Sequence, residues 1–293
     1  MTTRRALVLG GTAFVGRHLV AALLAAGWNV SLFNRGVTGP GLFPAATHLR
    51  GDRHDDVSAL RGGEWDAVFD VSGYHPDDIA RTGALLAGHC GHYIFISSIS
   101  AYAALPVPGL AEDAPLATIT GPAPDEVDSD SYGPLKALCE ARVAEIFDSH
   151  TIIRPTIVVG PHDPTDRFTY WVQRLSRPGG RLLSPDPTVS LQYIDARDLA
   201  HFIVLAAGSR SAGAFNVASP PVRFSQLIAA IMYETGLVFR PVVLTAMQLT
   251  AEGVQLWSDL PLVLPTDDAD MHGMFDLSTA RAEAAGLLSL IHI

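Results

Sequence analysis

The stretch LGGTAFVGRHL, residues 9–19, decides the fold. It joins the short apolar run RALVLG (5–10) to FVGRHLVAALLAAG (14–27), whose apolar residues recur at helical spacing and whose last residue, Gly27, is typical of a helix end. The order strand, glycine turn, helix presents main-chain N–H groups at a helix N-terminus, where a pyrophosphate binds. Glycine suits such a turn because it allows unusual backbone angles and lets phosphate approach closely.

The central glycine of this turn is replaced. Gly10 and Gly16 fit the spacing G-x-x-G-x-x-G of a dinucleotide turn, but Ala13 stands in the middle place. A methyl group tolerates a close approach, whereas a positive φ would be costly for alanine, so the motif is weakened but not abolished. We therefore expect a dinucleotide to bind to this turn, at residues Gly10, Thr12, Ala13, Phe14, Val15 and Gly16.

Strand and helix patterns alternate through the first half of the chain. NVSLFNRG (29–36), WDAVFDVSG (65–73) and HYIFISSIS (92–100) have strand character, and HPDDIARTGALLAGHC (75–90) has helical character. This alternation predicts an α/β fold with a doubly wound parallel sheet, the Rossmann arrangement, in which ligands bind beyond the carboxyl ends of the strands. The residues expected there as cofactor contacts are Asn34, Arg35, Asp52, Arg53, Ser72 and Gly73.

The end of the second strand bears on the choice of cofactor. An acidic residue at this place accepts hydrogen bonds from the ribose hydroxyls of NAD and repels a 2′-phosphate. Here the place holds Asn34 and Arg35, a neutral amide and a cation that pairs with phosphate. We therefore expect NADP, with NAD as the alternative; a purely solvated loop role for Arg35 is the competing interpretation.

A second motif, SDSYGPLKALCEARVAEIF (129–147), indicates acid–base chemistry. Tyr132 and Lys136 are four residues apart at the start of a helix, so their side chains share a face. A phenol titrates near ~10, and a fixed cation beside it lowers that pKa, so Tyr132 is expected to act as general acid or base. Lys136 is also expected to reach the nicotinamide ribose. Ser98 ends a strand and faces the same crevice, with Ser100 as the alternative, whereas alternation turns Ser97 away.

Six segments carry a resemblance to a known family. They are GGTAFVGRHLV (10–20), HLRGD (48–52), FISSISAYA (95–103), YGPLKALCE (132–140), IRPTIVVGPHD (153–163) and LQYIDARDLA (191–200). With them the chain resembles the extended and atypical short-chain dehydrogenases/reductases, the superfamily of nucleotide-sugar epimerases and dehydratases. The resemblance implies the catalytic trio Ser98, Tyr132 and Lys136, with Asp52 near the adenine and Pro155 after the last cofactor-contacting strand.

The resemblance also implies an activity: an NAD(P)-dependent epimerase or dehydratase acting on a hydroxyl or carbonyl of a nucleotide-sugar-like substrate. Three alternatives stay open: an NADP-dependent carbonyl reductase, a dinucleotide sensor without turnover, and an RNA-binding protein. The last arises because the similar chloroplast stem-loop-binding branch includes RNA-binding members. Fold alone does not choose between them.

Composition narrows the choice of partners. The chain has 293 residues, 48% of them hydrophobic, and a net charge of -10, which argues against nucleic acid and anionic membranes as partners. Only Cys90 and Cys139 are present, and the apolar run near the start is too short for a signal peptide, so we expect a cytoplasmic protein. The histidines near His162 and in HCGH (89–92) lack a second ligand pair, so no metal is expected.

The domain expectation is a dinucleotide-binding domain over 1–160 and a substrate lobe over 161–287, with about 188–217 returning to the main sheet. Arg167, Arg174 and Arg181 are candidates to meet a diphosphate. We interpret LSLIHI (288–293) as the translation of a sequencing adapter, so the natural chain is expected to continue beyond Leu287. Pairing into a homodimer, common in the superfamily, is left open.

Overall fold

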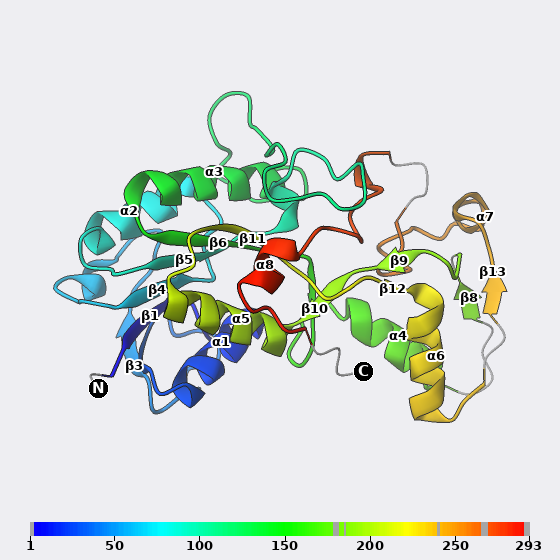
Figure 1. Cartoon of the computed structure of the whole chain (residues 1–293), viewed down its shortest axis with the longest axis horizontal. Coiled ribbons are helices and arrows are strands. Elements are labelled where there is room, and N and C mark those ends of the chain that lie inside the picture. Colours follow the sequence, from blue (N-terminus) through cyan, green and yellow to red (C-terminus); the bar gives the residue numbers. More distant parts are fainter. Residues whose placement is uncertain (1–2, 178–181, 185, 239–240, 265–268, 290–293) are drawn as a thin grey trace.

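The computed structural model describes residues 3–177, 182–184, 186–238, 241–264 and 269–289. Within them, seven strands form one sheet in the order β11-β6-β5-β4-β1-β2-β3, and every neighbouring pair is parallel (Figure 1). The predicted doubly wound parallel sheet is thereby confirmed. Its strands are β1 (Arg5–Leu9), β2 (Asn29–Asn34), β3 (Thr47–Arg50), β4 (Ala67–Asp70), β5 (Tyr93–Ile96), β6 (His150–Pro155) and β11 (Gly213–Val217).

Helices cover both faces of this sheet. In Figure 1, α2 (Pro76–Leu86) and α3 (Tyr132–Ile146) lie on one face, and α1 (Phe14–Ala25) and α5 (Ala196–Ser209) lie on the other. The alternation of β1 side chains explains this: Ala6 and Val8 pack in the core under α1 and α5, while Leu7 and Leu9 pack under α2 and α3. A strand segment buried on both faces must be apolar, as Ala6–Leu9 is; Arg5, the first residue of β1, is exposed.

The chain order reverses at β1, because β2 and β3 lie on one side of it and β4, β5 and β6 on the other. In open α/β sheets this reversal opens a crevice at the carboxyl ends of the strands. The first βα turn, residues 10–13, lies at that point. The glycine motif and the crevice therefore coincide.

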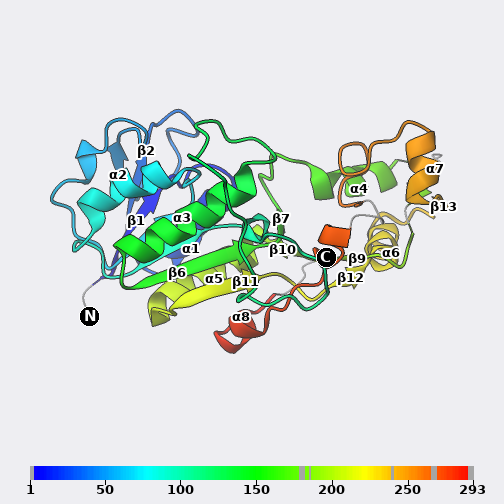
Figure 2. The same ribbon diagram turned by 90° about the horizontal axis from the view of Figure 1, so that it is seen from above.

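A second apolar core lies beyond the sheet, on the side where Figures 1 and 2 show α4, α6, α7 and β13. Trp171 is fully buried there and donates from Nε1 to the Pro261 carbonyl at 2.7 Å. The elements of this part are β7 (Ile157–Val159), α4 (Arg167–Leu175), β8 (Leu182–Ser184), β9 (Ser190–Leu191), β10 (Tyr193–Asp195), β12 (Val222–Arg223), α6 (Phe224–Thr235), β13 (Pro241–Val243) and α7 (Ala246–Ala251). The last helix, α8 (Ala280–Ala284), instead packs on the main core through Ala282.

The chain passes between the two parts near β6. β6 of the main sheet is followed directly by β7, which pairs in parallel with β10 in a separate two-stranded sheet, and β11 returns to the main sheet beside β6. Of the residues considered from the sequence, Arg181 and 290–293 lie outside the described residues. In the part of the chain that is described, each helix is too short or too polar to cross a membrane.

Substitution of Phe69, the buried aromatic residue of β4, tests the packing of the main core. Phe69 is fully buried and meets Trp28 edge to face, with ring centroids 6.0 Å apart. We expect Phe69→Ala to lower the free energy of unfolding by about 3–5 kcal/mol, because the deletion leaves a cavity. Urea unfolding followed by circular dichroism measures the change. Tyr233→Ala, at a side chain 85% exposed, is the control and should change stability by less than about 0.5 kcal/mol; equal losses would contradict the core assignment.

Candidate active site

A cavity of about 1100 Å³ follows the carboxyl ends of the strands of the main sheet. It begins at the turn after β1 and continues past the ends of β2, β4, β5 and β6, where ligands bind in such sheets. Of the residues expected from the sequence, those that line it are Gly10, Thr12, Ala13, Phe14, Val15, Gly16, Asn34, Arg35, Asp52, Arg53, Ser72, Ser98, Tyr132, Lys136 and Pro155. Gly73 does not line it; its carbonyl instead accepts a hydrogen bond from Lys136.

The glycine turn has the geometry of a phosphate-binding turn. Gly10 and Gly11 have φ of 103° and 92°, which disfavour any side chain. A Cβ at Gly16 would lie 2.9 Å from the Gly11 Cα, so the first turn of α1 packs directly on the loop. Gly11 was not among the residues expected from the sequence, although the Gly10-Gly11 doublet was a signal for it.

Ala13 is accommodated without backbone strain. It is the N-cap of α1, in extended conformation with φ −120° and ψ 150°, so the positive φ that would penalise alanine is not required. Its side chain makes no capping hydrogen bond, and the first turn of α1 carries no acidic residue. The helix N-terminus therefore keeps its N–H groups and its dipole for an anion, which fits the pyrophosphate of a dinucleotide.

Lys136 is buried and lines the cavity. Its Nζ donates to the carbonyls of Gly73, at 2.8 Å, and Ile96, at 2.9 Å. It also lies 4.7 Å from the ring centroid of Tyr74 and 4.8 Å from that of Phe95. Burial lowers the pKa of Lys136 to about 8, because desolvation disfavours the ammonium.

Tyr132, the first residue of α3, lies one helical turn before Lys136. The Lys136 Nζ is 5.9 Å from the Tyr132 ring centroid. Contrary to the expectation that this cation lowers the phenol's pKa, burial raises the pKa of Tyr132. The Ser98 hydroxyl and the charge of Arg167 act in the opposite direction, so these two groups are the ones that ease ionisation.

The two neighbouring serines at the end of β5 face opposite ways. Ser98 accepts from the Ser100 main-chain N–H at 3.1 Å and its side chain faces the cavity with Tyr132. Ser97 donates from Oγ to Glu140 at 2.5 Å, and Glu140 in turn pairs with Arg154 at 2.6 Å, both nearly fully buried. The hydrogen bond of Ser97 to Glu140 therefore fixes the end of β5 to α3 on the buried side, and this holds Ser98 in place.

Arg53 lines the cavity, but its guanidinium is already paired. It donates to both Asp70 oxygens, at 2.7 and 2.9 Å, and to the Ser72 hydroxyl at 2.9 Å. Burial alone would raise the pKa of Asp70, but the charge of Arg53 holds it below its usual range. Arg53 is thus a structural partner of Asp70 at this wall of the cavity.

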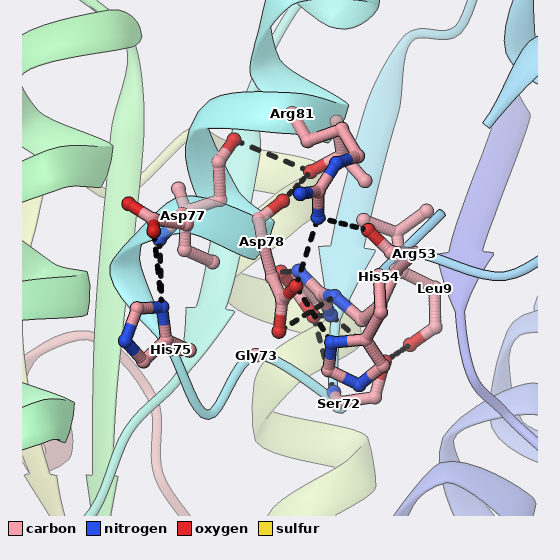
Figure 3. A network of polar contacts seen from close by, with 12 residues as sticks. Leu9, Arg53, His54, Ser72, Gly73, His75, Asp77, Asp78 and Arg81 are labelled. Atoms are coloured by element: carbon pink, nitrogen blue, oxygen red, sulfur yellow. Dashed lines mark hydrogen bonds and ion pairs between the residues drawn. The ribbon is translucent and has the colours of Figure 1, made fainter. Parts of the chain in front are cut away.

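Figure 3 shows a related network around Asp78, near the start of α2. The Asp78 carboxylate meets His54 at 2.9 Å and Arg81 at 3.3 Å, and the Arg53 Nε lies 3.9 Å away. Arg81 also donates to the Arg53 carbonyl at 2.9 Å. These contacts hold the loop after β3, including Asp52, against α2.

The far end of the cavity is lined by residues of the second core. Arg167 lies over the ring of Trp257, with Cζ 5.0 Å from the centroid, and both line the cavity with Met274. Trp257 has φ of 71°, a strained conformation for a bulky residue. Of the arginines considered from the sequence, Arg167 lines the cavity and Arg174 does not. Trp257 could not be found from local sequence because its segment is remote from the other lining residues.

No group of three or more His, Cys, Asp or Glu side chains is arranged to hold a metal ion among the described residues.

Known proteins share this fold and part of the sequence. The chloroplast stem-loop binding protein of 41 kDa b from Arabidopsis thaliana is 25% identical over 229 residues, 71% of this chain and 56% of that protein. The chain therefore spans only a little over half the length of this curated relative.

Solved structures cover nearly the whole chain. The UDP-Glc/GlcNAc 4-epimerase of Campylobacter jejuni is 14% identical with a TM-score of 0.71 (99% of this chain, 95% of that one). The Bordetella bronchiseptica enzyme WbmG, in complex with NAD and UDP, is 16% identical with a TM-score of 0.70 (100% and 92%). The UDP-N-acetylglucosamine 4-epimerase of Methanobrevibacter ruminantium M1 is 17% identical with a TM-score of 0.67 (97% and 99%). At these identities the likeness shows the fold.

The family is shown by sequence. The model of the NAD dependent epimerase/dehydratase family matches residues 6–218, which include the glycine turn, Ser98, Tyr132 and Lys136. The chain belongs to the NAD-dependent epimerase/dehydratase family.

Proposed function

We propose that this protein is an NADP-preferring oxidoreductase of the epimerase/dehydratase type that acts on a hydroxyl or carbonyl of a nucleotide-sugar-like substrate. The observation that carries the proposal is the convergence of Ser98, Tyr132 and Lys136 on the cavity that begins at the glycine turn. A nicotinamide dinucleotide bound along that cavity supplies the hydride acceptor and donor. The protein supplies orientation and proton transfer.

Each member of the trio has a distinct proposed role. When a substrate hydroxyl is oxidised, its proton passes to the Tyr132 phenolate oxygen. Ser98 donates a hydrogen bond to the reacting oxygen. The Lys136 ammonium, one turn along α3, reaches the nicotinamide ribose, while the Ser98 hydroxyl and the charge of Arg167 ease ionisation of the phenol. In the reverse direction Tyr132 returns the proton to a carbonyl oxygen, so the same residues serve an epimerase, a dehydratase or a reductase.

We assign the substrate's phosphates to the end of the cavity formed by Arg167 and Trp257. A guanidinium presents a planar fork that matches phosphate oxygens, and its stacking on Trp257 fixes that fork in advance. UDP is bound in the WbmG structure, and UDP-N-acetylmuramic acid in the Methanobrevibacter ruminantium enzyme. These relatives support a nucleotide sugar as the substrate class.

NADP is the proposed cofactor because Arg35, an exposed cation, lines the cavity where an acidic residue would favour NAD.

The proposed location is the cytoplasm. Cys90 and Cys139 are both free thiols, which supports it.

A second candidate function is RNA binding, favoured by the name of the Arabidopsis relative. The net charge of -10 argues against it. A gel-shift titration with a stem-loop RNA decides: micromolar binding with steep salt dependence would favour this candidate over the enzyme.

Tyr132→Phe tests the proposed acid–base residue. The substitution removes the proton-transferring oxygen, so we expect turnover of UDP-sugars to fall by about 10²–10⁴-fold. Dinucleotide affinity, measured by NADPH fluorescence, should be nearly unchanged. Tyr233→Phe, on the exposed face of α6, is the matched control. Undiminished turnover in Tyr132→Phe would remove the residue from the mechanism and favour a sensor or binding role.

The pH dependence of the oxidation rate tests whether Ser98 or Ser100 acts on Tyr132. The oxidation rate should rise with pH because the phenolate of Tyr132 is the base and its pKa is raised. The Ser98 hydroxyl lowers that pKa, so Ser98→Ala should move the rising limb to higher pH. Ser100→Ala should leave the limb in place. A shift in Ser100→Ala alone would transfer the role to Ser100.

Arg167→Gln tests the proposed phosphate contact. Loss of a charge-assisted pair should weaken UDP binding by about tenfold, measured by calorimetry. Arg174→Gln, on the same helix but outside the cavity lining, is the control and should bind UDP normally. Equal affinities in both variants would place the phosphates elsewhere.

A further inference from the structure

A second arginine, Arg50, lies next to the end of the cavity formed by Asn34 and Arg35, although it is not itself among the lining residues. Arg50 is the last residue of β3, and the parallel register of β2 and β3 places it opposite Asn34. Its Nη1 donates to the Asn34 Oδ1 at 3.0 Å. Arg50 is exposed, and the residues on which it lies, Asn34 and Gly36, line the cavity.

Gly36 makes this position of Arg50 possible. A Cβ at Gly36 would lie 1.8 Å from the Arg50 Nη1 and 2.3 Å from its Cζ. Gly36 also has φ of 74°, which disfavours other residues. The absence of a side chain therefore lets the guanidinium lie directly against the turn that follows β2.

The same contacts use up the acceptor capacity of Asn34. Its Oδ1 accepts from the Gly36 N–H at 2.9 Å and from Arg50, while its Nδ2 donates to the Gly10 carbonyl at 3.0 Å. An amide oxygen has two lone pairs, and both are engaged. Asn34 thus cannot accept hydrogen bonds from the ribose hydroxyls as an acidic residue does in NAD sites.

The charges around this corner are unevenly matched. Arg53 is paired with Asp70, and Asp52 accepts from the His54 N–H at 3.0 Å. Arg35 and Arg50 are both exposed, and the hydrogen bond of Arg50 to Asn34 involves one of the five N–H donors of a guanidinium. The ends of β2 and β3 therefore present two cations, Arg35 and Arg50, against the single carboxylate of Asp52 that lines the cavity nearby.

We propose that Arg50 and Arg35 together bind the 2′-phosphate of NADP, with Arg50 held in position by Asn34 and Gly36. This inference rests on the proposed dinucleotide binding and makes Arg50 a specificity-determining residue. Arg50 is fixed against the turn before the cofactor arrives, so little side-chain freedom is lost on binding.

Calorimetric titration with NADPH and, separately, NADH tests the proposal. We expect the unaltered protein to bind NADPH more tightly. Arg50→Gln should lower the affinity for NADPH about tenfold and change the affinity for NADH by less than about twofold, since only NADPH has the 2′-phosphate. Arg142→Gln, which removes the same charge from a pair with Glu145 on α3, is the control and should change neither affinity.

A second variant tests the role of Asn34. Asn34→Asp has the same shape, but its carboxylate pairs with Arg50 and repels the 2′-phosphate. The loss of the Nδ2 donor to the Gly10 carbonyl should weaken both dinucleotides alike, so the ratio of the two affinities is the measure. We expect it to reverse the preference toward NADH.

The remaining outcomes overturn the inference in distinguishable ways. If Arg50→Gln lowers the affinity for both dinucleotides equally, or for neither, Arg50 does not determine specificity and only connects β2 and β3. Tighter NADH than NADPH binding by the unaltered protein would overturn this inference and the NADP preference, while leaving the proposed epimerase/dehydratase-type chemistry intact. If neither dinucleotide binds, both this inference and the proposed function are wrong.

Discussion

The buried ammonium of Lys136 is the group on which the arrangement of the site depends. Placing a charge in the interior is costly unless it is hydrogen-bonded, and Lys136 meets this requirement with the carbonyls of Gly73 and Ile96, which follow β4 and end β5. Those two bonds dock the first turn of α3 on the strand ends. Tyr132 occupies that turn, so its phenol is carried to the cavity by the same contacts that keep Lys136 charged.

Two further buried ion pairs support this region from either side. Arg53 pairs with Asp70 beside the glycine turn, and Arg154 pairs with Glu140 behind Ser97. Removing one partner of such a pair leaves an uncompensated buried charge, which is far more destabilising than losing an exposed pair. The arginines that line the cavity therefore differ in role. Arg53 is paired with Asp70 inside the protein, whereas Arg167 lies over the Trp257 ring at the cavity wall.

Local sequence patterns predicted the sheet and the places of the glycine turn and of Tyr132 with Lys136, because apolar periodicity and the spacing of four residues act within one element. What they could not predict depends on neighbours distant in sequence. The pairing of Arg53 with Asp70 and the position of Arg50 require the strand order and register. The raised pKa of Tyr132 follows from its burial, and Trp257 comes from a segment that only the tertiary fold brings near.

Asn34, at the end of β2, links two parts of the site. A shared fold does not decide which ligand is bound, whereas the side chains at the strand ends do. In this chain Asn34 uses its amide to fasten the glycine turn through Gly10 and to hold Arg50. A single side chain therefore couples the geometry of the glycine turn to the position of Arg50, and a change at Asn34 affects both.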